Sequence, residues 1–119
     1  MTVRRLKTYT GSKGYVYQYY FVGQRPAAIM PEIPATEYIF DVTSDRKTTY
    51  AVSVLLPQQV VNAWDEVHGR SLKDSEQYAA AKLRLFRAFD ELEGMPTKGC
   101  RLQVDLQFLE ESLSTLGVE

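Results

Sequence analysis

Two side chains with chemistry near neutral pH occur once each in this sequence, His68 and Cys100. Catalysis by either would need a partner within hydrogen-bonding reach. Asp65 and Glu66 lie within one turn of His68, but no nucleophile accompanies them, and no base can be assigned to Cys100. We therefore expect His68 to cap the end of a helix and Cys100 to act as a small apolar residue.

The residue groups that hold metals or phosphates are also missing from the sequence. One histidine and one cysteine cannot supply a tetrahedral zinc site. The acidic pairs Asp65-Glu66 and Glu110-Glu111 do not converge, because adjacent residues on a helix point about 100° apart. No glycine-rich phosphate loop or nucleophile motif is present. We expect no metal and no cofactor, and an enzyme of unknown class is the least favoured alternative.

The most distinctive segment is residues 15–22, Tyr-Val-Tyr-Gln-Tyr-Tyr-Phe-Val. Side chains alternate between the two faces of a β-strand. One face therefore carries four aromatic rings: Tyr15, Tyr17, Tyr19 and Phe21. The other face carries Val16, Gln18, Tyr20 and Val22. Neither set suits water, so we expect a cover on both sides: the protein's own helices, a second copy of the chain, or a ligand that stacks on tyrosines.

The start of this strand is similar to a nucleic-acid-binding motif. Residues 13–17, Lys-Gly-Tyr-Val-Tyr, resemble the strand by which cold-shock and ribonucleoprotein-type domains stack bases on aromatic rings, with Val16 in place of a glycine. The resemblance implies single-stranded nucleic acid on Tyr15 and Tyr17. The basic residues that would meet phosphates are Arg4, Arg5, Lys7, Lys13 and Arg25. The formal net charge of -1 gives no general preference for nucleic acid.

Residues 23–36 contain Pro26, Pro31 and Pro34 with apolar residues between them. Proline lacks an N–H and is excluded from the interior of a sheet. The segment is therefore predicted to be a proline-rich flap, and the sequence leaves open whether it moves as a lid.

Two further strands follow, at residues 37–42 and 47–55. Their alternating apolar residues predict that Phe40 faces Tyr50 across a three-residue loop, Ser44-Asp45-Arg46. A shorter strand at residues 3–9 forms a hairpin with residues 15–22.

The C-terminal half is mainly helical. Pro57 and Gly69 delimit a first helix at residues 57–68, and a second begins with Asp74 or Ser75 as N-cap and ends before Gly94. Its apolar stripe includes Leu85 and Phe89, whereas the water-facing side is predicted to contain Ala80, Arg84, Arg87 and Glu91. Residues 101–108 fit a strand or a helix, and we favour a short strand through residue 104 and a helix at residues 105–116.

Lys82 interrupts the apolar stripe of the second helix, between Tyr78 and Phe86. It either lays its stem over the rings with its ammonium in water or binds a ligand carboxylate or phosphate.

These elements predict a single α+β domain over residues 1–119: an antiparallel sheet of three to four strands from the N-terminal half, with two or three helices packed on one face. No apolar run is long enough to span a bilayer, so we expect no membrane partner. The lone Cys100 fits a reducing compartment, and we expect a cytoplasmic protein.

Our leading hypothesis is a small binding module that binds a protein partner or a second copy of itself. The residues expected to bind are Tyr15, Tyr17, Tyr19, Phe21, Arg25 and Lys82. The alternatives are a single-stranded nucleic-acid-binding domain and an enzyme.

Overall fold

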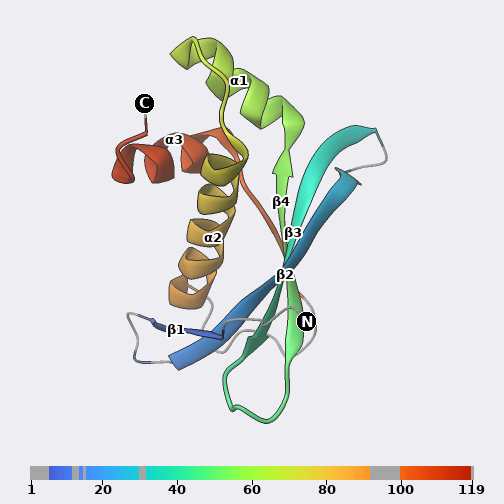
Figure 1. Cartoon of the computed structure of the whole chain (residues 1–119), viewed down its shortest axis with the longest axis vertical. Coiled ribbons are helices and arrows are strands. Elements are labelled where there is room, and N and C mark those ends of the chain that lie inside the picture. Colours follow the sequence, from blue (N-terminus) through green and yellow to red (C-terminus); the bar gives the residue numbers. More distant parts are fainter. Residues whose placement is uncertain (1–5, 12–13, 15, 30–31, 92–99, 119) are drawn as a thin grey trace.

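A computed structural model describes residues 6–11, 14, 16–29, 32–91 and 100–118 (Figure 1). In these residues one mixed sheet is accompanied by three helices, which confirms the α+β class. The strands are β1 (Lys7–Thr10), β2 (Val16–Ile29), β3 (Ile33–Thr43), β4 (Tyr50–Pro57) and β5 (Cys100–Gln103). The helices are α1 (Gln58–His68), α2 (Asp74–Glu91) and α3 (Leu106–Thr115).

The sheet has five strands in the order β1-β2-β3-β4-β5, and not the three to four that the sequence predicted. The first four form an antiparallel meander, and the predicted hairpin is present as β1 and β2. The additional strand, β5, pairs in parallel with β4. A parallel neighbour needs a long crossover, which α1 and α2 provide. The short strand before α3 was expected, but its place in the sheet was not.

The β3–β4 connection is longer than predicted. Phe40 faces Val52 and not Tyr50, which instead faces Val42. The residues between the paired positions Val42 and Tyr50 are 43–49, which is still an odd number, so both apolar sets face the same side as expected. The Asp45 carboxylate holds this wider turn together, because Oδ1 accepts the main-chain N–H groups of Lys47 and Thr48 over 2.8 and 2.9 Å.

The prediction that residues 23–36 form a loop is wrong. β2 continues to Ile29 and β3 begins at Ile33, with Pro26 facing Thr36 in the ladder. Pro26 lies on an edge of the sheet beyond the end of β1, where a missing N–H is tolerated. Pro34 precedes Ala35, the first β3 residue that pairs with β4, so it also interrupts no interior hydrogen bond. Pro31 lies outside the described residues.

The helices pack on one side of the sheet. Figure 1 shows α2 and α3 on that side, with α1 continuing from the end of β4. Trp64 of α1, Leu85 of α2 and Leu109 of α3 are all completely buried. The opposite side of the sheet, which we call the open face, carries Ile39, Asp41 and other residues that alternate with the core positions.

One side of α2 was predicted to face water but contacts α3 and β5. Ala80 is completely buried there. The guanidinium carbon of Arg87 lies 4.6 Å from the centre of the Phe108 ring, and Arg84 Nε donates to the main-chain oxygen of Gln103 over 3.1 Å. The prediction is wrong for Ala80, because a helical wheel of α2 alone contains no information about a later helix, whereas Arg87 and Glu91 are exposed as predicted. The predicted ion pair of Arg87 with Glu91 is present at 3.2 Å.

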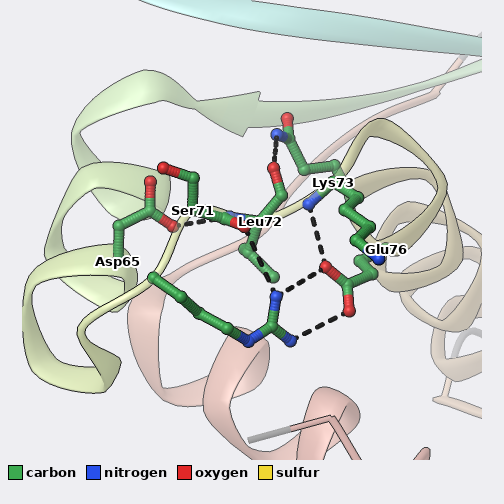
Figure 2. Close-up of polar contacts among 7 residues, drawn as sticks. Asp65, Ser71, Leu72, Lys73 and Glu76 are labelled. Carbon is green, nitrogen blue, oxygen red and sulfur yellow. Dashed lines mark hydrogen bonds and ion pairs between the residues drawn. The ribbon is translucent and has the colours of Figure 1, made fainter.

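The junction between α1 and α2 is fixed by two carboxylates (Figure 2). Gly69 ends α1 in the left-handed conformation, with φ of 67°, as the sequence predicted. Asp65 Oδ1 accepts the main-chain N–H of Leu72 over 2.9 Å, and Glu76 Oε1 accepts that of Lys73 over 2.8 Å.

The cap of α2 differs from the prediction, because Asp74 and Ser75 lie inside the helix. Glu76 instead accepts the main-chain N–H of Lys73, the residue before the helix, and so forms the acidic half of a capping box. The guanidinium of Arg70 donates to both Glu76 oxygens over 3.0 and 2.9 Å. Arg70 first, and the Lys73 N–H second, lower the pKa of Glu76 to about 2.

Replacing Glu76 by Gln should make the free energy of unfolding less dependent on pH in the acid range. The folded-state pKa of Glu76, about 2, lies below its ordinary value of 4.5, so the charged contacts stabilise the fold above pH 4.5 and are lost as the pH falls toward 2. We expect Glu76→Gln to cost about 1–2 kcal/mol at pH 7 and almost nothing near pH 2 in urea unfolding. Glu66→Gln, an exposed change on α1, is the control and should change neither value. Stability curves for wild type and Glu76→Gln that run parallel from pH 7 to pH 2 would contradict this assignment.

Candidate functional site

The tyrosines that were expected to bind a partner form the core. Tyr17 is 1% exposed and Tyr19 is 4% exposed. The Tyr17 ring stacks on Phe89 of α2 with centroids 4.3 Å apart and an interplanar angle of 7°. Burial raises the pKa of Tyr19 to about 12, and the nearby Tyr78 adds to this effect. The prediction that these two rings form an exposed surface is therefore wrong, because α2 covers them.

The other aromatic positions of this face differ. Phe21 is only partly buried and meets Tyr78 edge to face, with centroids 4.9 Å apart. Tyr15 lies outside the described residues. Since Phe89 occupies the ring face of Tyr17, that face is not available to a nucleic-acid base. Of the basic residues in the same hypothesis, Arg4, Arg5 and Lys13 lie outside the described part of the chain.

On the open face, Arg25 of β2 pairs with a buried carboxylate. Arg25 Nε lies 2.7 Å from Glu37 Oε1, and only 9% of the Glu37 side chain is exposed. The hydrogen bond from Arg25, followed by one from Ser53, lowers the pKa of Glu37, and Arg101 of β5 adds a smaller attraction. A carboxyl group held ionised in this way is a poor proton donor at neutral pH. The cluster instead links neighbouring positions of β2, β3, β4 and β5.

Around and beyond this cluster, β2 and β3 form an arm, residues 23–29 and 33–37. β4 pairs with β3 as far as Ala35, so only the last two pairs of the arm, Ala28–Pro34 and Ile29–Ile33, have no third strand beside them in the described part of the chain. Figure 1 shows the two strands extending together away from α2 and α3. Residues 26–29 and 33–36 carry no charge. Pro26, Ala28 and Pro34 are exposed, and Ile29 and Ile33 are partly buried.

The outer edge of β2 is only partly covered. β1 pairs with residues 16–19 of β2, and within the described part of the chain no strand pairs with this edge from residue 21 to residue 29. Opposed residues in an antiparallel pair exchange either two hydrogen bonds or none. Pro26 and Pro34 cannot donate, so the Pro26–Thr36 and Ala28–Pro34 pairs fit the positions that exchange none. By the same alternation, the N–H groups of Gln24 and Ala28 point away from β3, in the plane of the sheet and toward its outer edge.

Sequence reasoning missed this edge because the prolines were taken as proof of a loop. A signal for the arm is nevertheless present. Small and apolar residues are placed symmetrically about the turn, and the ladder pairs Ile29 with Ile33 and Ala27 with Ala35. An alternating apolar pattern on both sides of a short connection is typical of a hairpin.

Lys82 lies beside an aromatic ring of its own helix. Its Nζ lies 5.8 Å from the centre of the Phe86 ring. Burial, followed by the effect of Lys7, lowers the pKa of Lys82.

His68 is the last residue of α1, as predicted, and contacts α3. Its Nε2 lies 2.9 Å from Glu110 Oε2, and its ring stacks on Trp64 with centroids 4.0 Å apart. Cys100 begins β5. Among the residues that the structure describes, no group of three His, Cys, Asp or Glu side chains is placed to hold a metal ion.

The fold is therefore a mixed five-stranded α+β domain with a projecting arm. Comparisons with protein-family models, with curated proteins and with solved structures find no match. None of the helices in the described ranges combines the length and the apolar character needed to cross a membrane.

Substitutions at Tyr17 distinguish a core ring from a binding ring. Tyr17→Ala should cost about 3–5 kcal/mol in urea unfolding, because the ring is buried against Phe89. Tyr17→Phe should stay within about 0.5 kcal/mol of wild type, since the buried hydroxyl has no hydrogen-bond partner among the described residues. Tyr20→Phe is the matched comparison, and loss of the 2.7 Å bond to Asp41 should cost about 1 kcal/mol. A cost below about 1 kcal/mol for Tyr17→Ala would exclude a core role.

Proposed function

We propose that this protein is a binding module that works by strand addition: the free edge of β2, residues 21–29, pairs with a strand of another protein chain. The observation that carries the proposal is the length of this edge. It is longer than an average strand, and its outward-pointing N–H and C=O groups, which no strand in the described part of the chain accompanies, are a template for a further strand.

The composition of the arm supports this function. Edge strands that must remain single are commonly protected by charged side chains, especially lysine. Residues 26–29 contain none, and the protecting features of β2 are the irregularity between Phe21 and Gly23, the charged Arg25, whose side chain is 66% exposed, and the proline at position 26. These features leave outward donors at Gln24 and Ala28, on either side of Pro26, and so favour a particular register of the added strand.

We propose a second copy of the chain as the partner. A two-fold contact uses the same edge twice and needs no other surface. The charge on the arm allows this, because Arg25, which would otherwise repel its own copy, is already paired with Glu37. Val22, which is 38% exposed at the irregularity in β2, would lose contact with water in such a pair.

The roles expected for Tyr15 and Phe21 change in this proposal. The edge starts at Phe21, so this residue stays close to the contact, and Tyr15 lies before it. We place the activity in the cytoplasm on the basis of the sequence alone, because a single cysteine fits a reducing compartment.

The charged variant Ala28→Lys should weaken self-association. Ala28 is exposed in the monomer, so lysine does not disturb the core, but it would place a charge against the added strand. By light scattering after size exclusion, wild type should exceed the 13.6 kDa of one chain at high concentration, and the dissociation constant of Ala28→Lys should be at least about tenfold higher.

Ala51→Lys is the matched control, because Ala51 is also exposed but lies on β4. It should leave the mass unchanged. A mass of one chain at every concentration, or equal weakening by both lysines, would rule out self-association through β2.

A further inference from the structure

A hollow of about 320 Å³ lies between the end of the β2–β3 arm and β5. It brings together two strands that are not neighbours in the sheet, because β3 and β4 lie between β2 and β5. Its volume is at the lower end of the range for small-molecule sites. The residues that line it are Ala28, Ile29, Leu55, Arg101, Leu102 and Gln103.

The strand registers place most of the lining on the open face. Leu55 faces Glu37 in the β3–β4 ladder and Gln103 in the β4–β5 ladder. Residues directly opposite each other share a face of the sheet, and so do residues two apart on one strand. Arg101 is two residues before Gln103, and the β3 partner of Ile29 is four residues before Glu37. All of these side chains therefore belong to the face opposite the helices.

The walls of the hollow are mainly apolar. Leu55 is 5% exposed, Leu102 is 6% exposed, and Ile29 is partly buried. A ligand with an apolar body would cover these side chains further and would itself leave water, which is favourable.

Arg101 gives the hollow its charge. Among the described residues that line it, Arg101 alone is charged. Its side chain is exposed and takes part in none of the ion pairs formed within the described part of the chain. The carboxylate of Glu37, on the same face, is held by Arg25 at 2.7 Å. Arg101 therefore keeps its five N–H donors for an acceptor from outside the chain.

We propose that this hollow binds an organic carboxylate, whose charged group pairs with Arg101 and whose apolar chain lies against Ile29 and Leu55. The planar guanidinium matches the two oxygens of a carboxylate with two parallel hydrogen bonds. A monoanion balances the single charge of Arg101. A phosphate dianion would add an excess negative charge on the face that already carries Glu37, which disfavours it. The side-chain amide of Gln103 offers a further donor.

This proposal does not depend on strand addition. Arg101 lies on β5, whereas the edge proposed for strand addition belongs to β2. Because Ala28 belongs to both places, the variants that test the hollow are made at Arg101. Carboxylate binding is read from a titration and self-association from the mass, so either can fail without the other.

The test is an NMR titration of the whole chain near neutral pH, with ionic strength kept constant by chloride. The ligands are hexanoate, hexanamide and acetate. The Nε–H signal of Arg101 and the main-chain N–H signals of Leu55 and Gln103 should shift and saturate with hexanoate. Hexanamide lacks the charge and acetate lacks the chain, so each should bind at least about tenfold more weakly.

Variants at position 101 separate the charge from the planar shape of the guanidinium. Arg101→Gln should weaken hexanoate binding by about tenfold and leave hexanamide binding unchanged. Arg101→Lys keeps the charge without the two parallel donors, so its affinity for hexanoate should lie between those of wild type and Arg101→Gln. Arg46→Gln, at an exposed arginine in the β3–β4 connection, is the matched control and should leave both affinities unchanged.

A further ligand distinguishes the sources of the carboxylate. N-acetylleucine carries the carboxylate and the amide of a peptide C-terminus. Tighter binding of N-acetylleucine than of hexanoate supports the C-terminus of a peptide as ligand, and equal or weaker binding supports a free organic acid.

Three results would overturn the proposal. They are shifts that do not saturate with hexanoate, hexanamide binding as tight as that of hexanoate, and equal weakening by Arg46→Gln and Arg101→Gln.

Discussion

The stacking of β2 on α2 is the contact on which the rest of this structure depends. Tyr17 lies flat against Phe89, and Tyr19 meets Phe86 edge to face at 5.5 Å. These contacts hold the helical half against the strand half at the end of the sheet where β1 and β2 pair. At the other end, α2 does not cover the β2–β3 arm, and that end is where the edge is free.

Much of the secondary structure could be predicted from local patterns in the sequence. Gly69 marked the end of α1, and the alternation around Phe40 placed β3 and β4 with the correct faces inward. Asp105 caps α3 by accepting the N–H of Phe108 over 2.7 Å, close to the start that periodicity predicted. Such signals depend on neighbours within a few residues, which a single sequence shows directly.

The predictions that failed were of another kind, because they concerned residues whose surroundings are formed by other strands and helices of the chain. Whether Pro26 breaks a strand depends on whether another strand lies beside it, which the sequence does not state. Ala80 is completely buried within the packed fold, so its helix alone gave the wrong side. The candidate site follows the same rule, because the edge of β2 is free only where β1 stops pairing with it.

The place of β5 determines the order in which the chain can complete its fold. β5 joins β4 in parallel only after both α1 and α2 have been made, and α2 is also the element that shelters Tyr17. On a chain emerging from the ribosome, the apolar face of the β1–β4 meander therefore stays exposed to water until residue 91 has been synthesised. During that interval the exposed apolar face and the unpaired strand edges make the nascent chain prone to aggregation.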